Sequence, residues 1–206
     1  MSFVKNKIRM IKILFLSFFL FNVQLLGAQP KELMRTAEAG SSQAQFELGV
    51  IFLNGKGVSI DKSQARKWFL MAAKQGHPAA QYNLGVMAAT GDGVAGNIQE
   101  AVKWLNLAAE KGHAQAQYNL GTLYSVGQGV NKNAQAAEKW LRLAAEQGHT
   151  LAQNNLAVMY DVGDLVQKDL KEAGKWYRLA AEGGHSMSQY NLGVMYAYGD
   201  GVRKDY

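Results

Sequence analysis

Four histidines are the residues that most invite a chemical interpretation, because imidazole is a common zinc ligand and a common general base. They are all the histidines of the 206-residue chain, and they recur at a constant step as His77, His113, His149 and His185. Zinc needs its nitrogen ligands within about 2.0–2.1 Å, whereas packed helices stand roughly 8–10 Å apart. Histidines at equivalent positions of successive helices therefore cannot meet at one ion. Each follows a glycine, and we predict that each has a capping or turn role.

The tryptophans follow the same step and could in principle stack on sugar rings or bases. Each lies on the apolar stripe of an expected helix, which favours packing in the core; they are Trp68, Trp104, Trp140 and Trp176. A Gly-x-Gly-Val turn also recurs, but no strand precedes it and no Gly-Lys-Ser or Gly-Lys-Thr follows, as a phosphate loop would require. The sequence therefore predicts no catalytic residue, no metal site and no cofactor.

Composition disfavours several other classes of protein. The chain has no cysteine, which excludes disulfides, thiolate metal sites and a cysteine nucleophile. The net charge is +6, from 22 Lys and Arg against 16 Asp and Glu, but four of the basic residues lie in residues 1–28, which contain no acidic residue. The other 18 basic residues exceed the 16 acidic ones by only about two, too few for a nucleic-acid footprint. We expect no nucleic acid partner.

Residues 1–28 have the pattern of a secretory signal peptide. A basic segment from Lys5 to Lys12 precedes an apolar run from Ile13 to Phe21, and Gly27-Ala28 supplies small residues. The apolar run is about half of the roughly 20 residues that span a bilayer. We predict cleavage near Ala28, a periplasmic or secreted mature chain, and only transient membrane contact; an uncleaved anchor is the alternative.

The elements that must position the recurring residues are helices. Apolar residues at three- and four-residue spacing predict two helices in each repeat. The first helix is exemplified by residues 78–90 or so of one repeat, and the second helix by residues of about 61–75 of the preceding one. Asp61, Asn97, Asn133 and Asp169 have the character of N-caps, and Gly76, Gly112, Gly148 and Gly184 suit helix ends. One such pair cannot bury its own apolar face, so stacking of neighbouring pairs predicts a right-handed superhelix.

The shared unit contains an L-G-x-x-Y segment (Leu120 to Tyr124), a G-x-G-V turn (Gly127 to Val130) and an A-x-K-W segment that ends in A-A-x-x-G (Ala137 to Gly148). These motifs resemble the Sel1-like repeat, a relative of the tetratricopeptide repeat, over nearly all of residues 33–206. The resemblance implies an all-α fold, a right-handed α-solenoid of antiparallel helix pairs. In the fourth copy Ala157 and Leu165 replace glycines, so we expect a distorted turn there.

We divide the chain accordingly into a signal peptide and a series of repeats of 36 residues. The boundaries are 1–28 for the signal peptide, 29–43 for an N-terminal capping half-repeat, 44–79, 80–115, 116–151 and 152–187 for four full repeats, and 188–206 for a partial fifth.

The candidate binding residues lie on the face of each first helix that points away from its leucine. At 100° per residue, positions 82, 86 and 89 lie about 140–200° from Leu84, and by analogy with tetratricopeptide arrays this face lines a concave groove. An apolar and aromatic stripe that the core does not need is a candidate partner surface; coverage by neighbouring helices is the alternative. The set, called here the first-helix stripe, is Phe46, Val50, Leu53, Tyr82, Val86, Ala89, Tyr118, Thr122, Ser125, Asn154, Val158, Asp161, Tyr190 and Val194.

The resemblance together with export implies an interaction scaffold or adaptor that binds a protein or peptide in the groove and catalyses nothing. We expect the chain itself to be a monomer. Two alternatives stay open. One is a β-lactamase or cell-wall hydrolase, because some exported Sel1-like proteins have been assigned such activity, although those relatives are cysteine-rich. The other is a host-directed secreted effector.

Overall fold

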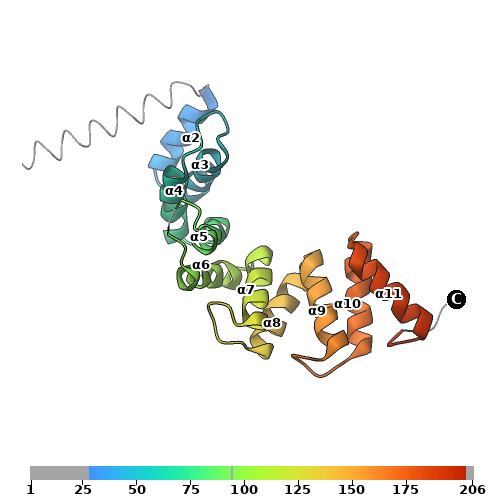
Figure 1. The fold of residues 1–206 in the computed structure, drawn as a ribbon. Coiled ribbons are helices and arrows are strands. Elements are labelled where there is room, and N and C mark those ends of the chain that lie inside the picture. The colour runs from blue at the N-terminus through green and yellow to red at the C-terminus, as the bar shows by residue number, and fades with distance from the viewer. Residues whose placement is uncertain (1–27, 94, 203–206) are drawn as a thin grey trace, which may run out of the picture. The chain divides into compact units, whose positions relative to one another are not determined.

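The computed structural model describes residues 28–93 and 95–202, and all regular secondary structure in these ranges is α-helical. The helices are α2 (Ala28–Glu38), α3 (Ser42–Asn54), α4 (Lys62–Lys74), α5 (Pro78–Thr90), α6 (Ile98–Glu110), α7 (Ala114–Val126), α8 (Ala134–Glu146), α9 (Thr150–Val162), α10 (Leu170–Glu182) and α11 (Ser186–Tyr198) (Figure 1). The predicted all-α class is confirmed, and the helices expected over 61–75 and 78–90 appear as α4 and α5. The predicted signal peptide falls on residues that lie outside the described ranges, apart from Ala28.

The described helices form two compact units, which divide between Ala80 and Gln81, within α5. In the first unit α2 packs on α3 and α3 packs on α4. In the second unit each helix from α6 to α11 packs on the next one along the chain (Figure 1). Contacts between sequence neighbours are the property of a solenoid of helix pairs. No described helix has the length and apolar content that crossing a bilayer requires.

Capping side chains set the limits of the second helices, as the sequence predicts. The Asn97 Oδ1 accepts a hydrogen bond from the Glu100 backbone N–H at 3.1 Å, and Asp61, Asn133 and Asp169 cap their helices in the same way. Such bonds satisfy backbone donors that have no partner inside the helix. The glycines expected after the second helices all have positive φ: Gly76, Gly112, Gly148 and Gly184.

The core contains most of the recurring leucines and tryptophans. The leucines of the first four repeats are at most 3% exposed: Leu48, Leu84, Leu120 and Leu156. Trp68, Trp140 and Trp176 are buried as predicted, whereas Trp104 is half-buried and its Nε1 lies 3.4 Å from Glu100 Oε1. Leu192, the equivalent leucine of α11, is only half-buried. The apolar core therefore weakens toward α11.

Glycines on the first helices allow the second helices to approach closely. A Cβ built on Gly121 would lie 2.6 Å from the Leu141 Cγ, and one on Gly85 would lie 2.9 Å from the Leu105 Cγ. Real Cβ atoms do not make contacts this short, so these positions have no room for a larger residue without movement of the neighbour. On α11 the situation differs, because a Cβ on Gly193 would meet nothing within 4 Å.

The turn of the fourth repeat departs from the others, as expected from Leu165. The second turn glycine has a positive φ in the other copies described, at 79° for Gly57 and 73° for Gly129. Within the described residues no non-glycine residue has a positive φ, so Leu165 takes a different backbone conformation. Its side chain packs against the core cluster that contains Leu156 and Tyr177.

Candidate protein-binding surface

The first-helix stripe is accessible to solvent along its whole length, because none of its residues is buried. Phe46, Tyr82 and Tyr118 are half-buried. Val158 is 38% exposed and Tyr190 is 69% exposed. Most of the stripe is thus partly exposed rather than fully buried or fully exposed, and the contacts of its aromatic rings explain this.

Each described aromatic ring of the stripe up to Tyr118 stacks on the histidine that begins the next first helix. The Tyr118 and His149 centroids lie 4.7 Å apart with planes 21° from parallel. Tyr82 stacks in the same way on His113, and Phe46 on His77, both at 4.7 Å. Offset stacking of this kind fixes the ring orientation. One face of each ring is therefore covered by the histidine that caps the next first helix, as the alternative of coverage by neighbouring helices expects, while the rest of the ring stays accessible.

The histidines also cap the first helices, which confirms the role predicted for them. The His149 Nδ1 accepts a hydrogen bond from the Ala152 backbone N–H at 3.2 Å, and its Nε2 lies 2.9 Å from the Gln115 Oε1. Because Nδ1 is the acceptor, the proton of the neutral ring belongs on Nε2, where it is donated to the glutamine. His113 and His185 are N-caps in the same manner.

Burial lowers the pKa of His77 and of His149 below the ordinary value for histidine. A proton on Nδ1 would remove the cap and place a positive charge at a helix N-terminus, where the dipole disfavours it. Both histidines are therefore neutral in the folded chain at a pH where an unfolded chain is already charged. The resulting stability is present in full above about pH 6.5, the pKa of an unperturbed histidine, and decreases as the pH falls below it.

We predict that the thermal midpoint of unfolding decreases when the pH is lowered from about 7.5 to about 5.5. The reason is that the unfolded chain takes up protons that these histidines do not bind in the folded chain. The double variant His77→Asn, His149→Asn keeps an N-cap acceptor at both positions but cannot titrate. It should show a smaller decrease over the same range, measured by circular dichroism. An equal decrease in the variant and the parent chain would assign the effect to other groups.

The fourth repeat replaces the stacked aromatic by a polar pair. Asn154 stands where Tyr118 stands in the preceding repeat, and its Oδ1 accepts a hydrogen bond from the Ser188 hydroxyl at 2.9 Å. Ser188 in turn replaces the alanine of the other copies and is fully buried, with its hydroxyl also 2.9 Å from the His185 Nδ1. The two departures compensate one another, so the stripe is interrupted at Asn154 while the helix contact is kept.

Buried glutamines hold successive helices together, a role that was not predicted from the sequence. Gln45, Gln117 and Gln153 are 2–6% exposed. The Gln117 Nε2 donates to the Ala109 carbonyl of the preceding helix at 3.1 Å, and its Oε1 accepts from the Gln147 Nε2 at 2.7 Å. Their recurrence in the A-Q-Y-N-L-G segment was a visible signal, because a polar residue that repeats beside the core leucine needs buried partners.

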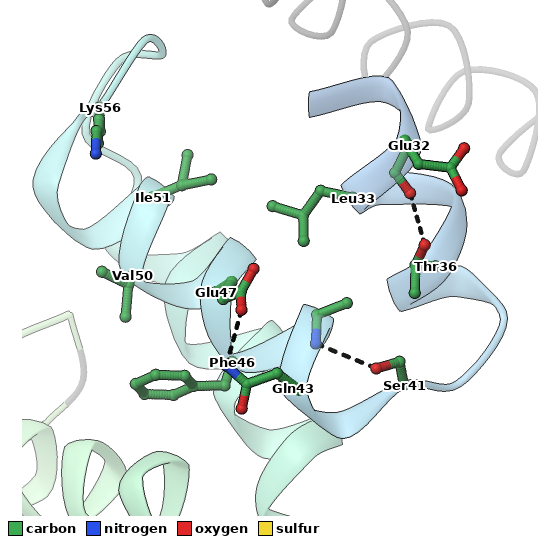
Figure 2. A pocket seen from close by; sticks show the side chains of 11 residues that line it. Glu32, Leu33, Thr36, Ser41, Gln43, Phe46, Glu47, Val50, Ile51 and Lys56 are labelled. Atoms are coloured by element: carbon green, nitrogen blue, oxygen red, sulfur yellow. Dashed lines mark hydrogen bonds between the residues drawn. The ribbon is translucent and has the colours of Figure 1, made fainter. Parts of the chain in front are cut away.

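Residues of the stripe line two hollows in the surface. The larger, about 870 Å³, lies between α2 and α3 in the first unit, where Phe46 and Val50 of the stripe join Leu33 and Ile51 (Figure 2). Figure 2 shows the Leu33 and Ile51 side chains directed toward one another across this hollow. Glu47 lies beside it and accepts a hydrogen bond from the Gln43 Nε2 at 2.8 Å. The hollow therefore has an apolar lining with acidic groups around it.

The smaller hollow, about 270 Å³, lies in the second unit. Ser125 and Val158 of the stripe line it together with Leu141 and Leu165. Of these four lining residues, Val158 is the most exposed. It is therefore the position where a change would alter the hollow while disturbing the core least.

A cluster of ionisable side chains joins α8, α9 and α10. The Tyr160 hydroxyl and the Arg142 guanidinium both bond to the Glu138 carboxylate, and Glu172 lies 3.9 Å from the guanidinium. The hydrogen bond from Tyr160 lowers the pKa of Glu138, and burial raises the pKa of Tyr160 to about 12. A general acid or base works best with a pKa near the operating pH. These groups instead keep one protonation state near neutrality, which suits a link between helices.

The described residues contain no group of three or more histidine and carboxylate side chains that could hold a metal ion. Their architecture is that of an all-α solenoid of helix pairs, in which capping histidines and buried glutamines join each repeat to the next. The chain belongs to the Sel1 repeat family, whose model matches residues 42–77, 78–113, 114–149, 150–185 and 186–206. Each complete family repeat ends on one of the capping histidines.

Solved structures show the same fold. A protective antigen of uropathogenic Escherichia coli strains with an SLR fold is 42% identical, with a TM-score of 0.81 over 85% of this chain and 38% of that one. A Sel1 repeat protein from Oxalobacter formigenes is 38% identical, with a TM-score of 0.74 over 81% of this chain and 66% of that one. The chain thus spans 38% and 66% of the lengths of these two proteins. Comparison with curated proteins gave no match. Sel1 repeat proteins typically take part in protein–protein interaction.

Proposed function

We propose that this protein is an exported, non-catalytic scaffold that binds another protein or a peptide along the first-helix stripe. The observation that carries the proposal is the state of the Phe46, Tyr82 and Tyr118 rings, which are half-buried and stack on histidines. Tyr82 and Tyr118 lose little conformational freedom when a partner covers them, because stacking has already fixed them. Rigid aromatic side chains are typical of the residues that contribute most to binding.

The hollows beside the stripe support the same role. The hollow that contains Val158 and Ser125 is apolar on most of its lining and offers a place for a side chain of a partner. Sel1 repeat membership supports protein binding in general. Export rests on the basic and apolar segments of residues 1–28, and fractionation of the producing cell tests it directly.

A catalytic role receives no comparable support from the side chains described. In the cluster of Glu138, Arg142 and Tyr160, the pKa of Glu138 is lowered and the pKa values of Arg142 and Tyr160 are raised, so all three move away from neutrality. The hydrolase alternative predicts turnover of a chromogenic β-lactam by the purified chain. The scaffold proposal predicts none.

We predict that Val158→Glu weakens retention of a partner captured from an envelope extract by about tenfold, because it places a charge at the mouth of an apolar hollow. Val126→Glu is the matched control, since Val126 is 63% exposed on α7 and does not belong to the stripe. Quantitative mass spectrometry of the captured proteins compares the two variants with the parent chain. Equal loss in both variants, or no loss in either, would refute binding through this part of the stripe.

A further inference from the structure

The hollow of the second unit lies among interior helices, where α7, α8 and α9 meet the turn that follows α9. Its volume of about 270 Å³ is below the roughly 300–1,000 Å³ of pockets that enclose a whole small molecule. Val158, which is 38% exposed, lies at its mouth. The size therefore suits one side chain of a bound peptide rather than a separate small ligand.

The fourth repeat builds this hollow with a residue that the preceding repeats lack. Leu165 lines the hollow, and it stands at the position of Gly129 in the third repeat. A Cβ on Gly129 would lie 2.5 Å from the Ile98 Cγ1, but one repeat later the position of Ile98 is taken by Ala134. The two changes compensate one another, since the smaller Ala134 leaves room for a side chain in the turn. Leu165 thus gives the fourth repeat an apolar wall that a glycine cannot provide.

The lining of the hollow combines an apolar surface with one charge. Its polar residues are Ser125, Asn155 and Asp164, and its apolar residues are Leu141, Val158, Met159, Val162 and Leu165. Asp164 is exposed, and it alone carries a charge among the described residues of the lining. Its carboxylate has no ion pair or hydrogen bond within the described ranges. An occupant that matches this lining has an apolar part and a positive charge.

The surroundings of the hollow also favour a positive charge. Helices α5, α7, α9 and α11 contain no lysine or arginine, and Asp161 is the one charged residue among them. Asp161 lies on the last turn of α9, and the hollow is at the same end of this helix, because the lining residue Val162 is its last residue. A helix C-terminus carries a partial negative charge, which stabilises a nearby cation. The carboxylates and the helix end therefore act in the same direction.

The basic side chains of the neighbouring elements are placed elsewhere. The Arg142 guanidinium of α8 bonds to the Glu138 carboxylate at 2.8 Å. The Lys139 Nζ lies over the ring of the adjacent tryptophan, 4.7 Å from its centroid. Lys168 belongs to the turn after α9, but it is exposed and does not belong to the lining. None of these three cations occupies the place beside Asp164.

We propose that this hollow binds a lysine or arginine side chain of a peptide segment held along the first-helix stripe. The methylene stem lies against Leu165 and Val158, and the cationic group lies at Asp164. Basic side chains bury their stems along apolar surface in this way while the charged end stays in water. The Ser125 hydroxyl donates its hydrogen to the Thr122 carbonyl at 2.7 Å, so its oxygen remains to accept a hydrogen bond from the cationic group.

This inference rests on the binding proposed above, and it adds the kind of residue that the partner must supply. It agrees with the loss expected for Val158→Glu, because Val158 lies on the wall that contacts the methylene stem. A carboxylate there removes the apolar contact whatever group ends the bound side chain.

Selection from a library of random peptides displayed on phage, with the full chain as bait, tests the proposal. We expect lysine or arginine to be enriched at one aligned position of the selected peptides, by about threefold or more over the unselected library. Asp164→Asn keeps the size of the side chain and removes its charge, so selection on this variant should lose the enrichment. Selected peptides without a basic position would overturn this inference and leave binding along the stripe standing.

A second outcome separates the two proposals in the other direction. A chain that selects no peptide would overturn the inference drawn from the hollow, whereas the comparison of Val158→Glu with Val126→Glu decides independently whether a partner protein binds to the stripe. The two results can therefore differ.

A double-substitution cycle locates the basic residue at the hollow. Asp164→Asn should weaken a selected peptide by about fivefold in fluorescence anisotropy, the upper part of the range for an exposed ion pair. Replacing the basic residue of the peptide with norleucine should cost the same on the parent chain and almost nothing on Asp164→Asn. Equal losses on both chains would place the basic residue elsewhere and overturn the proposal.

The matched control is Asp92→Asn, at the equivalent turn position of the second repeat, where Gly93 follows in place of Leu165. It removes the same charge from the second unit without touching the hollow, and it should leave peptide binding unchanged. A loss equal to that of Asp164→Asn would show general attraction by the negative charges of the chain instead of a site at the hollow.

Discussion

Replacing Leu120 with alanine is expected to lower the free energy of unfolding by about 2–5 kcal/mol, the range for a fully buried leucine. Leu120 is 0% exposed and belongs to a core cluster with Leu105, Ala109 and Trp140. The alanine would leave a cavity between α6, α7 and α8 that close-packed neighbours fill only in part. Urea unfolding followed by circular dichroism measures the loss.

The chain contains its own control for this experiment. Leu192 and Leu120 both lie in a Gln-Tyr-Asn-Leu-Gly segment, but Leu192 is half-buried because no second helix covers α11 within the described residues. Leu192→Ala should cost about 1 kcal/mol, in proportion to the smaller apolar area that it uncovers. Equal losses at the two positions would mean that burial by the next repeat does not set the stability of a repeat.

The regular part of this fold could be predicted from the sequence because the same residue types recur at the same positions of each repeat. Asn97 and Gly112 delimit α6 as their types and spacing indicate, and the same types recur at the limits of α4, α8 and α10. Every element thus carries a local signal that agrees with the long-range packing. Trp104 departs from its copies because burial depends on neighbours that the sequence pattern does not specify.

For the candidate site, the sequence predicts which helix positions form the stripe, but not which side chains contact them. Helical periodicity places Tyr82 and Tyr118 on the stripe, but it does not indicate that a histidine 31 residues later stacks on each ring. That contact depends on the rotation between successive helices, which follows from packing. Gln117 was missed for a similar reason, since its partners Ala109 and Gln147 come from other helices.

Gly121→Ala and Gly193→Ala should change stability in opposite directions, although both replace the glycine of a Gln-Tyr-Asn-Leu-Gly segment. At Gly121 the new Cβ would lie 2.6 Å from the Leu141 Cγ and 3.0 Å from its backbone nitrogen, so the helices must move apart. Overpacking of this kind costs about 1–3 kcal/mol. At Gly193 the Cβ meets open space, and the better helix propensity of alanine should add about 0.5–1 kcal/mol. Urea unfolding at a concentration where the chain is single compares both variants.

The fourth repeat indicates how the loss at Gly121 could be reversed. Ala157 stands at the equivalent position and is fully buried, and the residue in the place of Leu141 is Tyr177, which is 1% exposed. The double variant Gly121→Ala, Leu141→Tyr transfers this pair to the third repeat, where Ser125 can receive the new hydroxyl as Asp161 receives that of Tyr177. It should be more stable than the sum of the single changes predicts, by about 0.5–3 kcal/mol of coupling. Additive effects would mean that the distance between these helices is set elsewhere than at this glycine contact.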